Sequence, residues 1–90
     1  MPSSGVSTVW CVYMLRCADG SLYTGITTDV VRRVAEHNAG GTVGARYTRS
    51  RRPVQLIHVE PAATRAEATR REAAIKRFDR ARKLALLAPA

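Results

Sequence analysis

The residues best suited to chemistry lie on two predicted helices. Arg33 and His37 are four positions apart, a spacing that stacks two side chains on one helix face. On a later helix, Glu72 lies near the stripe of Ile75, which should face the core. A carboxylate among apolar neighbours is costly unless a cation or donors meet it. Its partner could be Arg33, Lys76 or a divalent metal, so this pattern predicts a polar, partly buried site.

The charge balance indicates a polyanionic partner. The 90-residue chain carries 15 Lys and Arg against 7 Asp and Glu, a net charge of +8. Almost all of the excess is arginine, whose fork of donors matches phosphate geometry. A chain this basic attracts nucleic acid, DNA or RNA. A composition rich in alanine and arginine is also typical of GC-rich genomes, so charge alone does not decide.

The segment 42–53 concentrates part of this charge. It has no apolar period, and we interpret it as an exposed basic loop. Arginines there would meet phosphates, and a tyrosine would stack on a base or contact a sugar. The alternative is a solvated flexible loop. The expected substrate-binding residues are Arg46, Tyr47, Arg49, Arg51 and Arg52.

The elements that must position these residues follow from apolar patterning and capping signals. We expect strands over 9–17, 22–27 and 54–60 (ended by Pro61), and helices over 29–38, 64–78 and 80–87, the first of them capped by Thr28 or Asp29. The order β-β-α-β-α-α predicts an α/β (α+β) domain, a three-stranded antiparallel sheet with helices against one face, in two layers. We expect one domain over 9–88 after a disordered tail over 1–8.

Neither a secretory signal nor an apolar run of about 18 residues is found in the sequence. Cys11 and Cys17 match no metal-ligand spacing and are too far apart in one strand to bridge. Two unpaired thiols favour a reducing compartment. We therefore expect a cytoplasmic protein that does not engage membranes.

Two triplets in the first two strands carry a family resemblance. Val-Tyr-Met (12–14) and Tyr-Thr-Gly (23–25) resemble the two halves of the GIY-YIG nuclease signature. Arg33, His37 and Glu72 stand where that superfamily keeps its arginine, histidine and metal-binding glutamate. The resemblance covers about residues 10 to 87. It is closest to the small stand-alone bacterial GIY-YIG proteins.

The resemblance implies metal-dependent hydrolysis of phosphodiester bonds with a single Mg²⁺ or Mn²⁺ ion. Tyr13 would be the general base or would orient the attacking water, and Tyr23 and His37 would position groups and relay the proton. Arg33 would hold the scissile phosphate and Glu72 the metal. Metal and arginine neutralise developing charge, and one carboxylate with waters and phosphate is an ordinary Mg²⁺ arrangement. A tyrosine base, with its pKa near about 10, would need nearby cations.

A shared site also constrains the first hairpin. A two-residue turn at Asp19 and Gly20 would put Tyr13 and Tyr23 on opposite faces of the sheet. We therefore predict a three-residue turn, 18–20, with Gly20 left-handed. Gly25, inside the second strand, predicts a bulge or a close approach by backbone or substrate.

The sequence departs from the family pattern in one region. Many members place an asparagine well after the glutamate, whereas Asn38 is the single asparagine here. The resemblance implies a DNA endonuclease that selects structure rather than sequence and serves DNA repair or processing. The alternative is a nucleic-acid-binding module or accessory subunit with weak or no nuclease activity.

Overall fold

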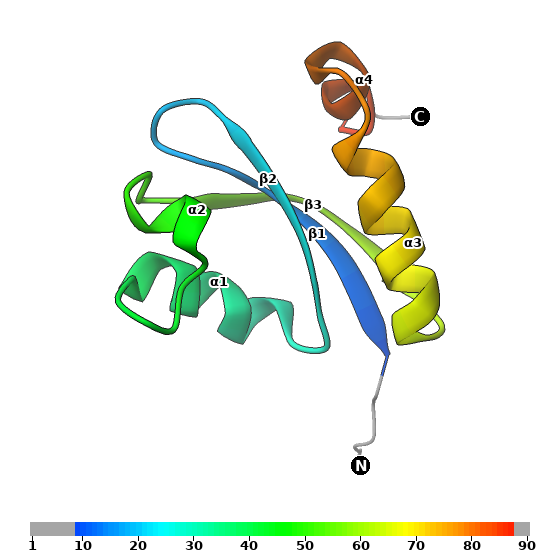
Figure 1. Ribbon diagram of the computed structural model, residues 1–90, viewed down its shortest axis with the longest axis horizontal. Coiled ribbons are helices and arrows are strands. Elements are labelled where there is room, and N and C mark those ends of the chain that lie inside the picture. The colour runs from blue at the N-terminus through cyan, green and yellow to red at the C-terminus, as the bar shows by residue number, and fades with distance from the viewer. Residues whose placement is uncertain (1–8, 88–90) are drawn as a thin grey trace.

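The chain forms three strands and four helices in the computed structural model, which describes residues 9–87. The predicted tail over 1–8 and the predicted domain end at 88 lie outside the described residues. The elements are β1 (Trp10–Arg16), β2 (Leu22–Thr27), α1 (Val30–Ala39), α2 (Arg46–Arg49), β3 (Gln55–Ala62), α3 (Arg65–Lys76) and α4 (Arg80–Ala85) (Figure 1). The predicted antiparallel sheet and element order are confirmed, with the one-turn helix α2 added inside the predicted loop.

The sheet has β1 at its centre, in the order β2-β1-β3, with both neighbours antiparallel. The register places Tyr13 opposite Gly25 and Leu15 opposite Tyr23. Opposed residues point to the same face and side chains alternate along a strand, so Tyr13 and Tyr23 share a face. The hairpin therefore satisfies the condition for a joint site.

The turn between β1 and β2 has the predicted odd length. The Cys17 amide donates to the Ser21 carbonyl and the Gly20 amide to the Cys17 carbonyl, both at 2.9 Å, which leaves residues 18–20 in the loop. Gly20 has φ 85°, the left-handed conformation that a side chain disfavours. The three-residue turn with Gly20 left-handed is confirmed.

Helices cover both faces of the sheet, so the prediction of helices on one face in two layers was wrong. Tyr13 and Leu15 face α1, where Val30 and Val34 pack against them. Val12, the alternate residue on β1, packs with Ala68 and Ile75 of α3. Figure 1 shows α1 and α2 on one side of the sheet and α3 on the other. Because β1 is apolar at both parities, it needs cover on both sides.

The third strand runs past the proline that was expected to end it. Pro61 lies within β3 and pairs with Cys11 of β1. Since β3 is an edge strand, proline is tolerated there and its missing amide breaks no central ladder. The prediction that the strand ends at Pro61 was therefore wrong.

Side-chain caps fix where three of the helices begin. Asp29 accepts from the Arg32 amide, Thr64 from the Glu67 amide and Asp79 from the Arg82 amide. The helix ends differ from the predicted ones by no more than two residues. None of the helices within residues 9–87 is long and apolar enough to cross a membrane.

Candidate active site

Tyr13 is the centre of a buried polar cluster on the α1 side of the sheet. Its side chain comes from the middle of β1 and is only 1% exposed. Its hydroxyl lies 2.9 Å from His37 Nε2. The Tyr13 and Tyr23 ring centroids are 6.4 Å apart, and Tyr23 meets the His37 ring edge-on at 5.2 Å. The structure thus brings the two tyrosines and the histidine together.

Gly25 makes room for the phenol of Tyr13. A Cβ built at this position would lie 2.5 Å from the Tyr13 hydroxyl oxygen and 2.7 Å from Cζ. The close approach expected at Gly25 is therefore made, in the free protein, by the Tyr13 side chain. The backbone here has no positive φ, so the need for glycine is one of space.

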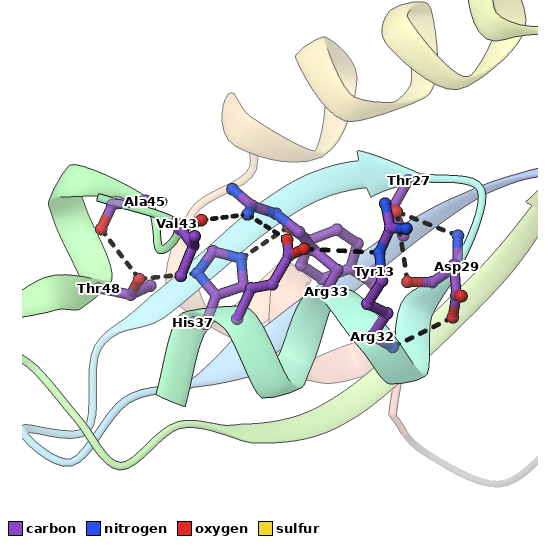
Figure 2. Close-up of polar contacts among 10 residues, drawn as sticks. Tyr13, Thr27, Asp29, Arg32, Arg33, His37, Val43, Ala45 and Thr48 are labelled. Carbon is purple, nitrogen blue, oxygen red and sulfur yellow. Dashed lines mark hydrogen bonds and ion pairs between the residues drawn. The ribbon is translucent and has the colours of Figure 1, made fainter. Parts of the chain in front are cut away.

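His37 continues the polar chain beyond Tyr13. It lies in the last turn of α1, is fully buried, and its Nδ1 is 2.7 Å from Thr48 Oγ1. Thr48 in turn donates to the Ala45 carbonyl at 3.1 Å. Figure 2 draws this contact. Burial, and secondarily the charge of Arg33, lower the pKa of His37 to about 4. The imidazole is therefore neutral near pH 7 and is not a charged partner of the helix dipole.

Arg33 lies one turn before His37, on the same side of α1 as the spacing predicted. Its Nη1 donates to Glu36 Oε1 at 2.9 Å and to the Val43 carbonyl at 2.7 Å (Figure 2). The Tyr13 hydroxyl is a further neighbour of this guanidinium and helps to raise the pKa of Arg33. The pairing of Arg33 with Glu72, one of the expected alternatives, is replaced by pairing with Glu36.

Tyr13 is a protonated phenol in the free protein. Burial first, and then the neighbouring Tyr23, raise its pKa to about 12. Arg33 acts against this rise, whereas the charge of Glu72 adds to it. The nearby cation is present, as a tyrosine base requires, but it does not outweigh desolvation.

Glu72 lies on α3, the helix on the opposite side of the sheet from α1. It is partly buried, with its Oε2 3.3 Å from Lys76 Nζ. Its charge acts on Tyr13 through space. No hydrogen bond joins it to Tyr13, Arg33 or His37 among the described residues. The expected pairing with Lys76 is thus the one the structure forms.

A single carboxylate fits one kind of metal site. Within residues 9–87 no group of three or more His, Cys, Asp and Glu side chains could hold a metal by itself. Mg²⁺ commonly binds through one or two carboxylates together with waters and substrate phosphates. Glu72, oxygen-bearing and partly exposed, fits such a site, in which substrate completes the coordination. In the free protein this carboxylate is paired with Lys76 of the same helix.

The basic segment divides into two kinds of arginine. Arg51 donates to Asp19 and Arg52 to the Asn38 and Ala39 carbonyls at the end of α1, so both hold the segment in place. Arg46 and Arg49, on α2, are exposed.

Tyr47 lies between Arg46 and Arg49 in sequence, and its ring packs against two planar groups. Its ring stacks on Tyr23 at 5.8 Å and the Arg51 guanidinium lies 4.0 Å from its centroid. The alternative of a wholly flexible loop does not fit these contacts.

Three residues of the site escaped prediction. Thr48 is buried against His37, and no pattern among the surrounding arginines marks it. Glu36 pairs with Arg32 and Arg33, a contact that its helical spacing could have suggested. Asn38 bonds both the amide and the carbonyl of Val54, at 2.7 and 3.1 Å, and so ties the end of α1 to the approach of β3.

The fold and this arrangement of side chains agree with a match over most of the chain. The family model of the GIY-YIG catalytic domain matches residues 9–85, and the chain belongs to this family of nuclease domains. The predicted resemblance is confirmed.

Relatives of the chain include small UPF0213 proteins. UPF0213 protein DP2720 of Desulfotalea psychrophila is 55% identical over 78 residues, which cover 87% of this chain and 70% of the relative. UPF0213 protein VNG_2274C of Halobacterium salinarum is 59% identical over 75 residues, which cover 83% of this chain and 95% of the relative.

Solved structures of two proteins share the fold. The solution NMR structure of UPF0213 protein BH0048 from Bacillus halodurans has a TM-score of 0.56 and 41% identity, and covers 89% of this chain and 83% of that one. The solution NMR structure of protein EF2693 from E. faecalis has a TM-score of 0.58 and 51% identity, with coverage of 84% and 79%.

Proposed function

We propose that this protein is a metal-dependent DNA endonuclease that selects its substrates by structure rather than by base sequence, in DNA repair or processing. The observation that carries the proposal is the buried pair of Tyr13 and His37, joined at 2.9 Å beside Arg33. Binding to phosphates relies on exposed cations and needs no buried phenol–imidazole pair. Proton transfer to or from a reacting water requires a positioned acid or base, and such a pair can supply it.

The free protein holds these groups in a resting state that substrate would alter. Arg33 is bonded to Glu36 and to the Val43 carbonyl. A phosphodiester beside Arg33 would compete for that guanidinium and offset its charge. Since this charge lowers the pKa of His37, its neutralisation makes His37 a better proton acceptor. Substrate binding thereby prepares the site for the reaction.

The remaining residues have distinct parts in this proposal. Tyr13 takes a proton from the attacking water as its own proton passes to His37, and Tyr23 lines the site beside both rings. Gly25 leaves the space that the Tyr13 phenol needs. A single Mg²⁺ or Mn²⁺ held by Glu72 would supply charge neutralisation at the scissile phosphate.

The surface around α2 supplies binding rather than chemistry. Arg46 and Arg49 are exposed on α2 and would contact the backbone phosphates of DNA or RNA beyond the site. Tyr47, Arg51 and Arg52 would contribute through the shape they give the segment as well as through contact. The free thiols of the two cysteines support a reducing, cytoplasmic setting.

The test is cleavage of labelled duplex, single-stranded and branched DNA, with matched RNA, in Mg²⁺, Mn²⁺ or EDTA. We expect metal-dependent cleavage, strongest on branched DNA, that falls by at least about 10²-fold in Tyr13→Phe and Glu72→Gln. Glu67→Gln is the matched control, because Glu67 lies on the same helix as Glu72 and a glutamine can keep its capping contact.

A nucleic-acid-binding module or accessory subunit is the second candidate. The observation that favours it is that the site is closed to solvent. Tyr13 is 1% exposed, and residues 9–87 form no pocket that would admit a substrate. Such a module would bind DNA with a steep salt dependence, equally in Mg²⁺ and EDTA at matched ionic strength. Binding without cleavage, unchanged in Tyr13→Phe and Glu72→Gln, would replace the nuclease with this module.

A further inference from the structure

We infer that Thr48 is a positioning residue that holds His37 with its proton on Nδ1, so that the lone pair of Nε2 is aimed at the Tyr13 hydroxyl. The purpose of this arrangement rests on the proposed function, but the arrangement itself is a property of the free protein. Thr48 reaches His37 from α2, across 11 residues of chain, and both side chains are fully buried.

The contacts of Thr48 limit how the protons can be arranged. Its Oγ1 lies 2.7 Å from His37 Nδ1 and 3.1 Å from the Ala45 carbonyl. A hydroxyl has one proton and can donate to only one of them. The Ala45 carbonyl also accepts from the Arg49 amide at 3.1 Å, so it is satisfied either way and does not decide the direction.

The surroundings of Tyr13, at the other end of this series of hydrogen bonds, indicate which direction the bond between Thr48 and His37 takes. If Thr48 donated to Nδ1, Nε2 would carry the imidazole proton and donate to the Tyr13 oxygen. The Tyr13 proton would then need another acceptor. Among the described residues the other hydrogen-bonding neighbour of the hydroxyl is Arg33, which has only donors, and Tyr23 and Glu72 act on Tyr13 through charge alone. A buried hydroxyl proton without an acceptor is unfavourable.

In the opposite direction every proton finds an acceptor. Tyr13 donates to Nε2, the Nδ1 proton goes to Thr48 Oγ1, and Thr48 donates to the Ala45 carbonyl (Figure 2). Within residues 9–87 no buried side-chain nitrogen or oxygen lacks a partner. The imidazole is neutral near pH 7, because its pKa is lowered to about 4, so it has a tautomer to be fixed.

This direction suits the proposed reaction. As the water oxygen bonds to phosphorus, the bond from phosphorus to the leaving ester oxygen breaks, and that oxygen leaves as an alkoxide that is protonated by solvent water. In the same step the Tyr13 O–H bond breaks, its proton bonds to Nε2, and the phenol oxygen takes a proton from the attacking water. His37 becomes an imidazolium whose Nδ1–H still donates to Thr48. No side chain has to turn during the transfer. A proton already on Nε2 would block the same step.

The test begins with ¹⁵N-histidine NMR of the free protein, which needs no nuclease activity. The chain has two histidines, so His58→Gln assigns the spectrum. We expect a protonated Nδ1, an unprotonated Nε2, and an Nδ1 proton that exchanges slowly with water, in wild type and in Thr48→Ser. Thr48→Val should speed this exchange at least about tenfold, because the buried donor loses its acceptor.

Cleavage kinetics then test the purpose. Thr48→Val should lower kcat on the order of 10²-fold with little change in KM, since Thr48 is fully buried, and Thr48→Ser should restore it. Thr42→Val, at an exposed threonine of the same segment, is the control. If Thr48→Val does not fold, Thr48→Ala removes the same oxygen without placing a methyl group against Nδ1.

Three results would overturn the inference. They are a wild-type proton on Nε2, slow Nδ1 exchange in the folded variant without the hydroxyl, and an unchanged kcat in that variant when wild type cleaves. A protein that shows the expected NMR spectrum yet cleaves nothing would instead contradict the proposed nuclease and leave the tautomer assignment standing.

Discussion

The two sides of β1 bury different kinds of side chain. Towards α1 the strand presents Tyr13, which joins His37 and Thr48 in a chain of hydrogen bonds. Towards α3 it presents Val12, which packs with Ala68 and Ile75 in an apolar cluster. The charged groups of the α3 side lie at its margin, where Arg71 meets Glu60 at 2.7 Å.

This difference separates two tasks within one small domain. Apolar packing depends on volume and area and tolerates small displacements. A buried hydrogen-bond chain depends on direction, and each lost partner leaves a desolvated polar group. We therefore expect the α3 side to supply stability and the α1 side to supply chemistry, with Glu72 as the one contribution of α3 to the site.

The largest expected effect is on the α3 side. Ile75→Ala should lower the free energy of unfolding by about 2–5 kcal/mol, because Ile75 is fully buried and the cavity would not close completely. The ¹⁵N shifts of His37 should stay at their wild-type values at temperatures where the variant is folded. Urea unfolding and the histidine spectrum give the two measurements.

The control for this variant is Val31→Ala on α1. Val31 is 79% exposed, so its truncation should change stability by less than about 0.5 kcal/mol. A folded Ile75→Ala protein with altered His37 shifts would show that the two sides are coupled through the sheet, and the division of tasks would then fail.

The features that could be predicted from the sequence are the ones that depend on neighbouring residues in the chain. The strands, the caps and the odd-length turn follow from local chemistry, namely apolar runs, Asp29, Thr64 and a left-handed Gly20. The Arg33–His37 spacing likewise follows from helix geometry. The position of helices on both faces was missed because an apolar run such as 9–17 does not reveal how many faces are covered.

The details of the site depended on contacts that sequence does not encode locally. The bond between Thr48 and His37 joins α2 to α1, and α2 itself has no amphipathic signal over its four residues. The structural roles of Arg51 and Arg52 were also hidden, because an arginine that caps a carbonyl and one that awaits a phosphate look alike in sequence.

As the pH falls, the two sides of the sheet should lose their contributions to the free energy of unfolding one after the other. Burial lowers the pKa of His37 from 6.5 to about 4, so the unfolded chain takes up this proton first and stability falls as pH drops from 6.5 to 4. Arg71 lowers the pKa of Glu60 from 4.5 to about 2, so its contribution falls between pH 4.5 and 2. Each loss is at most about 3 kcal/mol.

Unfolding measured from pH 8 to 2 in two variants separates these ranges. His37→Gln should flatten the profile between pH 6.5 and 4, where Arg33 and Glu36 are the charges nearest the ring. Glu60→Gln should flatten it below pH 4.5, where Arg71 and His58 are its partners. If either variant flattened the stability profile in both pH ranges, the two sides of the sheet would not be independent.

Gly25→Ala should change stability less than Ile75→Ala does, but should change the site more. Gly25→Ala would place a Cβ 2.5 Å from the Tyr13 hydroxyl oxygen, and the buried phenol would have to shift. Overpacking of this kind costs about 1–3 kcal/mol. The displaced hydroxyl should lose its bond to His37, with changed Nε2 shifts and a loss of cleavage comparable to that of Tyr13→Phe.

Gly20→Ala is the matched comparison, because it costs a similar free energy for another reason. A Cβ at Gly20 meets nothing within 4 Å, but the left-handed backbone, at φ 85°, costs about 1–2 kcal/mol with a side chain. This variant should keep wild-type His37 shifts and cleavage. If both alanine variants changed the His37 signal equally, the effect at Gly25 would be general destabilisation, and the close fit of Tyr13 over Gly25 would not be what sets the site.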